Sequence, residues 1–592
     1  MSSTRFILLV ALISAALANP LGSTHQRRSG PPEGFSAVGF SPQDETITFR
    51  IALTQKDLPG LEKALYAAAT PGSPQYGQYL TKAQVNEYAA PSAEGVASVS
   101  SWLESQGLSP SSMSPSGDWI SVKATVSQAN RLLQAEFMAY RAEGVDDPVI
   151  RTLSYTLPAE VKDYVAAVHP TNVFPPLRDA RVQAVRNVTS AAAESDARSM
   201  AGLLPRAQPT DIPPSCLPGP EDDSVAWTRP YGLTCRFDLY GIPNTTVGDA
   251  VADNSLWVSG YYNDFANKNM TKDYLNAWRP ELIDREMFSL VAITGGMNNQ
   301  LPGGAGLFGT AAVTTAMSTV VNTPVTFMSV GTDNAGGEDP IVWFIDQANY
   351  LLEQEKPPRV LVGDWPMPES WMDLTLATSL CNSYAQLAAR GVSLVFPVSS
   401  DGVGWMRDGS ECPKFDVTFP ASCPYVTGVG GSSISDDGTS VEIDSWNSGG
   451  FSNYFPRPTY QDTAVPQYIE SLEPGVYEGM WDPSGRGTPD VSVHKWWTVA
   501  PDAGYTYGSS SFSASLFGSI VALLNEELLA AGKSPLGFLN PLIYQNLDIF
   551  SDFTTGNNPG CDTPGFNATT GWDPVSGAGS PVYAKLRAAA GL

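Results

Sequence analysis

The C-terminal part of the chain alternates short apolar runs with stretches of helical spacing, and this pattern constrains the fold most strongly. The runs typical of buried strands are FSLVAIT (288–294), PVTFMSV (324–330), PRVLVGD (358–364) and GVSLVFPV (391–398). Between them lie stretches with helical spacing, such as IVWFIDQANYLLEQ and TLATSLCNSYAQLAARG. Strands that alternate with helices form parallel sheets with helices on both faces. We therefore expect an α/β domain with a doubly wound parallel sheet over residues 215–592.

The N-terminal part of the chain predicts three further segments. MSSTRFILLVALISAALANP has a basic residue, a short apolar core and a small-residue cleavage pattern, which indicates a secretory signal peptide over residues 1–18. Residues 19–176 interleave strand and helix patterns, such as ETITFRIALTQ and DLPGLEKALYAAAT, and predict a separate α+β domain. Residues 177–214 are rich in Ala, Ser and Pro without a period, and they predict an exposed linker of the kind that proteases cut.

Charge and hydropathy restrict the classes of partner. The formal net charge is −26 and no basic patch is visible, so we do not expect nucleic acid as a partner. An acidic surface suits a protein that works in acid, although it also serves plain solubility. No stretch after the signal peptide is long and apolar enough to span a bilayer. The sequence therefore predicts a secreted, extracellular, soluble protein without a membrane partner.

The cysteines and the N-glycosylation sequons are also consistent with a secreted protein. Six cysteines in an oxidising environment predict disulfides, although spacing alone does not give their connectivity. N-x-S/T sequons predict possible glycans on surface loops at Asn187, Asn244, Asn269 and Asn567.

Several longer segments match motifs of one family. They are SPQYGQYLTKAQVNEYAAPSAEGVASVSSWLESQGL near the N-terminus, and then VTFPASCPYVTGVGG, SWNSGGFSNYFPRPTYQ, GRGTPDVSV and GWDPVSGAGSP in the large domain. The first segment resembles the kumamolisin-type activation propeptide of the sedolisins, the serine-carboxyl peptidases. The others resemble motifs of the sedolisin peptidase domain, in the family's order. The resemblance implies a subtilisin-like fold, a polypeptide substrate and the chain's own propeptide as a partner.

The stretch GSSSFSASLFGSIVALLN (508–525) resembles the family's G-T-S-A-S motif at the start of a buried helix. The resemblance places Ser511 at the position of the catalytic nucleophile. Two flanking residues differ from the family, because Ser509 replaces a glycine and Phe512 replaces an alanine. Phe512 is bulky beside a site that must admit a peptide.

The acids that activate the family's serine are missing. In the family a Glu and an Asp at E-x-x-x-D spacing share one helix face. The matching positions here are Thr310 and Thr314, and a threonine hydroxyl cannot accept a proton at useful pH. No Asp or Glu lies between Glu286 and Asp333, so a shift of a few residues does not restore the pair.

Other segments that line the family's site also depart from its pattern. The third acid, which stabilises the oxyanion, aligns with Ser400, or with Asp401 after a one-residue shift. The strand that ends S-x-S-W/Y-G in the family reads VGDWP here, with Asp364 before the retained tryptophan. A Ser-His-Asp triad needs a histidine, and the chain has three. His25 and His169 lie in the predicted propeptide, and for His494 the sequence favours a structural or surface role over a triad role.

The calcium motif is better preserved than the catalytic motif. The resemblance implies one structural calcium ion, held by oxygen ligands of the kind that calcium prefers. The implied ligands are the carboxylates of Asp552 and Asp573 and the carbonyls of Phe553, Thr569 and Gly571. The resemblance also implies a Cys412–Cys561 disulfide, which leaves the pairs Cys381–Cys423 and Cys216–Cys235.

The sequence leaves open whether the protein is an enzyme. Removing the triad's base in subtilisin costs about 10⁶ in kcat, so the leading interpretation is a secreted sedolisin homologue with little or no proteolysis that binds peptides or proteins. A second interpretation is an active acid endopeptidase or tripeptidyl-peptidase, with Ser511 activated by a substitute acid such as Asp364 or Asp401. A third is a structural secreted glycoprotein.

Overall fold

The computed structural model describes most of the chain after the predicted signal peptide. The described residues are 24–145, 147–175, 212–217, 232–245, 248, 251, 253–262, 264–301, 306–331, 339–404, 412–435, 440–500 and 505–592. The signal peptide, most of the predicted linker and the sequon at Asn187 lie outside the described residues.

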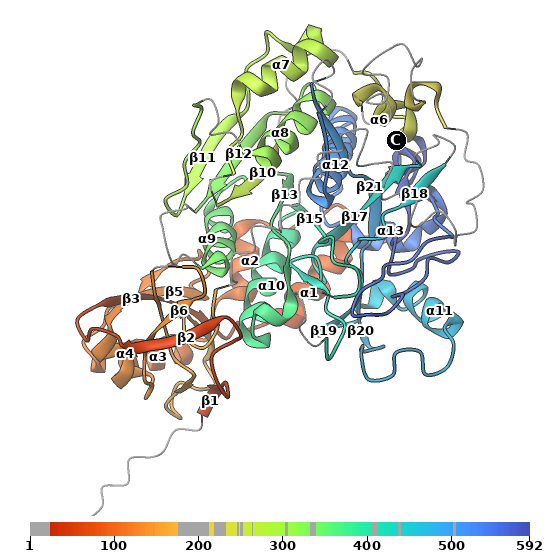
Figure 1. The fold of residues 1–592 in the computed structure, drawn as a ribbon. Helices are drawn as coiled ribbons and strands as arrows, with labels where there is room; N and C mark the ends of the chain where they lie inside the picture. Colours follow the sequence, from red (N-terminus) through yellow and green to blue (C-terminus); the bar gives the residue numbers. More distant parts are fainter. Residues whose placement is uncertain are drawn as a thin grey trace, which may run out of the picture.

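An eight-stranded sheet forms the centre of the C-terminal domain (Figure 1). Its order is β11-β12-β10-β13-β15-β17-β18, and β21 also pairs with β17. The bounds are β10 Leu256–Tyr261, β11 Ser289–Ile293, β12 Val325–Val330, β13 Val360–Val362, β15 Ser393–Pro397, β17 Thr427–Ile434, β18 Val441–Ile443 and β21 Val491–His494. Apart from the antiparallel β17–β18 pair, these strands run parallel. The doubly wound α/β fold is thereby confirmed.

Helices cover both faces of this sheet. α8 (Leu307–Thr319) and α12 (Ser510–Ala530) pack on one face, and α9 (Pro340–Glu353) and α10 (Leu374–Ala389) pack on the other. Alternation along β13 explains this arrangement, because Val360 and Val362 join the core around α12 while Leu361 joins the core around α9 and α10. The strands' carboxyl ends meet at one edge, where open α/β sheets place their sites.

Two expectations from hydropathy need correction. FSLVAIT forms β11, but within the described residues this strand pairs on one side only. Leu290 is 47% exposed, so β11 is an edge strand and not a buried one. By length and composition α12 could cross a membrane, contrary to the expectation for the chain after the signal peptide. Since 89% of the helix's most apolar stretch is buried, the apolarity reflects a position in the core.

The N-terminal domain is α+β, as the sequence predicts. A four-stranded antiparallel sheet has the order β4-β5-β3-β9, and a three-stranded sheet has the order β2-β6-β7. The bounds are β1 Thr24–Arg27, β2 Phe35–Phe40, β3 Thr46–Leu53, α1 Leu58–Ala69, α2 Lys82–Ala89, α3 Ala93–Ser105, β4 Ser111–Ser112, β5 Trp119–Thr125, α4 Val126–Leu132, β6 Met138–Ala142, β7 Val149–Arg151, β8 Ser154–Thr156 and β9 Val165–His169. Helix starts follow capping rules, since the side chain of Asp57 accepts a hydrogen bond from the Gly60 amide.

The remaining elements of the C-terminal domain are short and surround the sheet. The helices are α6 Leu233–Tyr240, α7 Lys268–Trp278, α11 Ala464–Ser471, α13 Asn540–Gln545 and α14 Tyr583–Ala589. The strands are β14 Met367–Pro368, β16 Thr418–Phe419, β19 Gly450–Pro456, β20 Gly485–Thr488, β22 Trp496–Ala500, β23 Tyr505–Gly508, β24 Phe550–Ser551 and β25 Ser580–Pro581.

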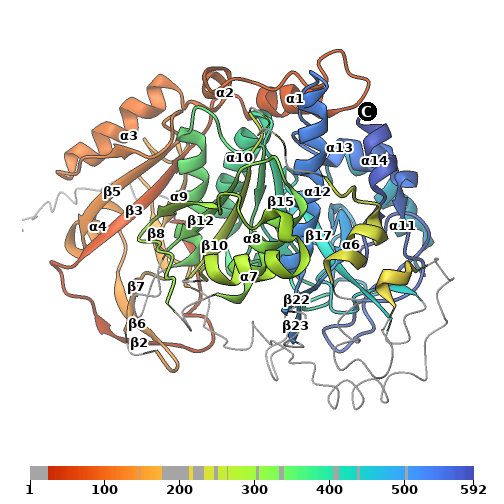
Figure 2. The ribbon, with the colours of Figure 1, turned by 90° about the horizontal axis from the view of Figure 1, so that it is seen from above.

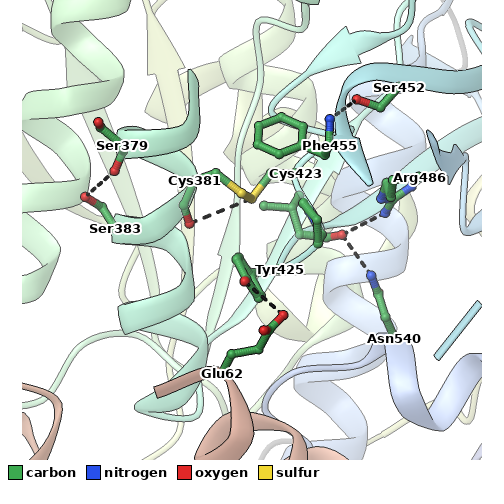
Figure 3. The surroundings of a disulfide bond; sticks show 12 residues. Glu62, Ser379, Cys381, Ser383, Cys423, Tyr425, Ser452, Phe455, Arg486 and Asn540 are labelled. Carbon is green, nitrogen blue, oxygen red and sulfur yellow. Dashed lines mark hydrogen bonds between the residues drawn. A yellow bond between two sulfur atoms is a disulfide. The ribbon is translucent and has the colours of Figure 1, made fainter. Parts of the chain in front are cut away.

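The N-terminal domain packs against α9 and α10 (Figure 2). Trp119 is 1% exposed, and its Nε1 donates a hydrogen bond of 3.0 Å to Ser383 Oγ of α10. Near the Cys381–Cys423 disulfide, the Tyr425 hydroxyl donates to Glu62 of α1 at 3.1 Å (Figure 3). The two domains therefore share a buried interface with specific polar contacts.

Three disulfides join the six cysteines. They are Cys216–Cys235, Cys381–Cys423 and Cys412–Cys561, which is the pairing that the family resemblance implies. The structure therefore confirms that set of disulfides, with no free cysteine left.

Candidate active site

Ser511 lies in the first turn of α12, at the carboxyl edge of the sheet. The N-cap residue is Ser509, whose hydroxyl accepts a hydrogen bond of 3.2 Å from the Ser511 amide. Serine is a favoured N-cap residue because its oxygen satisfies an amide that has no partner within the helix. The polar cluster thus starts the helix and fixes where Ser511 stands.

The serines around Ser511 make a different kind of bond. Ser513 Oγ donates to the Val493 carbonyl at 3.0 Å, and Ser510 Oγ donates to the Val398 carbonyl. Ser511 Oγ instead donates to a carboxylate, Asp364 Oδ1, at 2.5 Å. A hydroxyl that donates to a carboxylate has a proton acceptor already in place. This contact distinguishes Ser511 from its neighbours.

Asp364 follows β13 by two residues, and α12 packs on that strand. Removal from solvent raises the pKa of Asp364, while the hydrogen bonds from Ser511 and from the Trp365 amide oppose the rise. Trp365 has φ = 61°, in the left-handed region that a bulky residue rarely adopts. Such backbone conformations cluster at functional sites, where the surrounding structure holds them in place.

A second carboxyl group lies near Asp364. Asp264 follows β10, the neighbour of β13 in the sheet, and its Oδ2 accepts a hydrogen bond of 2.5 Å from the Gly309 amide at the start of α8. Burial first, and then the negative charge of Asp364, raise the pKa of Asp264 well above its ordinary value. Sequence analysis missed Asp264; the available signal was an acid three residues beyond a strand at the sheet's carboxyl edge.

Thr310 and Thr314 lie on α8 and are fully buried. Thr310 Oγ1 donates to the Phe265 carbonyl at 3.0 Å and accepts from the Asn267 amide at 3.1 Å. Thr314 Oγ1 donates to the Thr310 carbonyl at 2.5 Å. Both hydroxyls are therefore engaged in structural bonds, and neither supplies a proton acceptor for Ser511.

The two candidates for the family's third acid, Ser400 and Asp401, follow β15 in the chain. Ser400 is exposed. Asp401 accepts from Ser399 Oγ, and its own amide donates to Ser448 Oγ at 2.9 Å. Burial raises the pKa of Asp401 to about 6, against hydrogen bonds from Ser399 and Ser448. The structure thus brings Asp364, and not Asp401, to the serine hydroxyl.

Phe512 does not crowd the site as its size suggested. It is 1% exposed, and its ring packs 5.5 Å from Phe308 and 6.1 Å from Trp497, measured between ring centroids. Because Ser511 and Phe512 are neighbours on a helix, their side chains point in different directions. The phenylalanine therefore fills the core beside the site.

The residues implied as calcium ligands lie in one loop region. The Gly571 amide donates to Asp552 Oδ2 at 2.7 Å, and the Thr569 amide donates to Asp573 Oδ2 at 2.9 Å. Burial raises the pKa of Asp573 to about 7, which a bound cation would offset. Among the described residues no three His, Cys, Asp or Glu side chains cluster as a metal site, so an ion here needs the loop carbonyls, as calcium permits.

The described sequons are exposed. Asn244 and Asn567 lie outside helices and strands, whereas Asn269 lies in the first turn of α7 and not on a loop as expected. A helix start still presents its side chains to solvent, so the position remains accessible.

A parallel α/β domain with a carboxylate-bonded serine at a helix start, and a separate N-terminal domain docked on it, defines a peptidase-like protein with a propeptide. The model of the pro-kumamolisin activation domain matches residues 33–174. Tripeptidyl-peptidase SED4 of Arthroderma otae is 31% identical over 98% of this chain and 96% of its own length. Probable tripeptidyl-peptidase SED2 of Arthroderma benhamiae is 29% identical over 98% of each chain. The chain belongs to the sedolisin family of serine-carboxyl peptidases.

Among solved structures, Pseudomonas sedolisin complexed with two molecules of pseudo-iodotyrostatin is similar to part of this chain. It is 18% identical, with a TM-score of 0.43, over 57% of this chain and 93% of that chain.

Proposed function

We propose that the protein is an acid-acting serine peptidase in which Asp364 takes the role of the absent family glutamate. The observation that carries this proposal is the 2.5 Å hydrogen bond from Ser511 Oγ to Asp364 Oδ1. It favours the second interpretation of the sequence over a protein that only binds peptides, because the serine keeps a proton acceptor although Thr310 and Thr314 carry none.

The contact supports a complete proton path for acyl transfer. Ser511 Oγ attacks the peptide carbonyl carbon while its proton passes to the Asp364 carboxylate. Asp364 then gives this proton to the leaving amine as the C–N bond breaks, which leaves an acyl-serine. A water molecule gives a proton to Asp364 and attacks the acyl carbon, and the proton returns to Ser511 Oγ as the acid leaves. A carboxylate with a raised pKa suits such transfers in weakly acidic solution.

The substrate, compartment and metal are part of the same proposal. The names of the relatives favour release of tripeptides from the free N-terminus of polypeptides. The signal pattern and the sequons favour a secreted glycoprotein. Calcium, held by the carboxylates and carbonyls of the loop that contains Asp552 and Asp573, would neutralise two acids and tie their segments together.

The proposal is tested by comparing the full-length chain with S511A and D364N in acid. We expect the wild type to cleave its own linker (residues 177–214) and a peptide with a free N-terminus. S511A and D364N should reduce kcat by about 10⁴-fold or more, as removal of triad members does in subtilisin.

D416N is a matched control for D364N, because Ser370 Oγ donates to Asp416 Oδ2 at 2.5 Å, which is also the distance between Ser511 Oγ and Asp364 Oδ1. The Ser370–Asp416 pair is not part of the candidate site. D416N should keep wild-type activity. Full activity in D364N would reject Asp364 as the base, and loss in D401N alone would transfer the role to Asp401. A wild type without cleavage in acid would restore the binding interpretation, which retention of peptides on immobilised protein would then support.

A further inference from the structure

The position of Asp264 relative to Asp364 follows from the sheet. β10 and β13 are parallel neighbours, with Val258 opposite Val362. Asp264 lies three residues beyond the end of β10, and Asp364 lies two residues beyond the end of β13. The carboxyl ends of adjacent parallel strands meet at one edge of the sheet, so both carboxyl groups belong to the edge where Ser511 stands.

Asp264 is held there by the first turn of α8. Its Oδ2 accepts from the Gly309 amide, and the Phe308 amide also stabilises the carboxylate. A Cβ on Gly306 would lie 1.8 Å from Asp264 Oδ1, so the backbone fits closely around this carboxyl group. A helix start favours an acidic group, because its amides lack partners within the helix.

Thr310 fixes the segment that carries Asp264. Through one hydroxyl it bonds both the Phe265 carbonyl and the Asn267 amide, so α8 is tied to residues 265–267 directly after the aspartate. The helix position at which the family carries its glutamate thus supports a carboxyl group on a neighbouring segment.

We propose that Asp264 and Asp364 form a carboxyl pair that shares one proton in acid. This inference rests on the proposed function, and Asp264 is a positioning residue that acts through Asp364. Two neighbouring carboxyl groups at one partly buried site do not both ionise readily. The groups that face Asp264 are the Phe308 and Gly309 amides of α8 and the charge of Asp364. Asp364 in turn faces the Ser511 hydroxyl of α12 and the Trp365 amide, and its charge also acts on the Tyr261 hydroxyl of β10.

The carboxyl pair limits the activity of the enzyme at high pH. Activity rises with pH as Asp364 ionises and can accept the proton of Ser511. At higher pH Asp264 ionises as well, and the pair then carries a second negative charge beside a reaction whose transition state develops further negative charge. Unfavourable charge at this position raises the barrier, so activity falls. Asp264 thereby confines the activity of Ser511 to acid.

The test measures kcat/KM against pH for the full-length wild type, D264N and the control D416N. Asparagine mimics the protonated acid and keeps an acceptor for the Gly309 amide. D264N should keep the rising limb of the wild-type pH profile but lose its falling limb. At pH 7 its kcat/KM should be about tenfold or more above that of the wild type, which corresponds to a shift of the falling limb by at least one pH unit. A residue with only a structural role would lower activity equally at every pH.

The outcomes separate this inference from the proposed function. An active wild type whose pH profile matches that of D264N overturns the carboxyl pair and leaves Asp364 as the base. A wild type inactive at every pH overturns both proposals. Should D264N fold poorly, Asp264→Ser provides the second variant, because serine also accepts hydrogen bonds from helix-start amides, and the same shift of the falling limb is expected.

Discussion

Thr310 shows how a single residue changes the role of a helix position. A glutamate there would present a carboxylate, whereas the threonine hydroxyl bonds the Phe265 carbonyl and the Asn267 amide inside the core. Buried polar groups require such partners, since an unpaired amide or carbonyl is costly. The side chain at this position therefore holds the neighbouring segment in place, where the family's glutamate would supply a base.

Thr310→Val tests this structural role at nearly constant side-chain volume. Valine leaves the Asn267 amide without that partner, whereas the Phe265 carbonyl keeps its hydrogen bond of 2.9 Å from the Gly306 amide. One unsatisfied buried group costs about 1–3 kcal/mol. We expect a lower free energy of unfolding for T310V, measured by urea denaturation with tryptophan fluorescence in an S511A background that prevents self-cleavage.

Thr314→Val is the matched control. The Thr314 hydroxyl donates to the carbonyl of Thr310 within its own helix, and that carbonyl already accepts the helical bond from the Thr314 amide. Loss of the Thr314 hydroxyl should therefore lower the free energy of unfolding by less than loss of the Thr310 hydroxyl. Equal losses in the two variants would contradict the role assigned to Thr310.

At the scale of single residues, the sequence shows that the family's two helix acids are missing more clearly than it shows which acid replaces them. The interval from Glu286 to Asp333 contains no acid, so the missing helix pair is visible in the sequence. The contact between Ser511 and Asp364 joins residues 147 positions apart, and the sequence offered Asp364 only as one of two substitutes. Parallel strands bring distant segments together at one edge, and local patterns do not specify which side chains then touch.

At the scale of elements, periodicity predicts most helices and strands. α1 begins after Asp57, and α9 and α10 follow the stretches with helical spacing. Edge position is not visible in an apolar run, so the sequence predicts β11 as a buried strand. Burial of α12 likewise depends on what packs around it, since composition alone does not separate a core helix from a membrane span.

The calcium loop provides a prediction at the same scale. If calcium binds between the segments of Asp552 and Asp573, calcium at about one hundred times its Kd should raise the free energy of unfolding by about 2.7 kcal/mol. Thermal unfolding of the full chain with calcium or with a chelator measures this difference.

D552N should remove the response to calcium, because it removes a carboxylate ligand. Asp562 is an exposed acid of the same region and is not an implied ligand, so D562N should respond like the wild type. A chain whose melting temperature is unchanged by the chelator would contradict the site.

At the scale of the whole molecule, α9 joins the two domains through evenly spaced acids. Asp339, Asp346 and Glu353 recur every seven residues, so they lie near one face of the helix. Their partners on the N-terminal domain are basic. Arg151 and His169 lie 2.8 Å from Asp339, Arg50 lies 2.8 Å from Asp346, and Lys82 lies 3.4 Å from Glu353. Charge pairing along α9 thus fixes the docking of the predicted propeptide.

The Asp339 contact predicts how docking depends on pH. Burial alone would raise the pKa of Asp339, but His169 and Arg151 outweigh it and hold the pKa at about 2. A depressed pKa contributes stability above the ordinary carboxyl range, and this stability is lost as pH falls through about 4 towards 2. D339N removes the charge, while asparagine keeps the N-cap of α9.

In an S511A background, D339N should therefore lower the free energy of unfolding by about 3–5 kcal/mol at pH 6, because Arg151 loses its buried partner. This penalty should shrink steadily below pH 4, since Asp339 takes up a proton in the unfolded parent chain from about pH 4, whereas in the folded chain it stays ionised down to about pH 2. Lys82→Ala is the control, because Glu353 is 51% exposed and such pairs contribute about 0–1 kcal/mol. A D339N penalty that is equal at pH 6 and pH 3 would show that packing around Asp339, and not its charge, holds the two domains together.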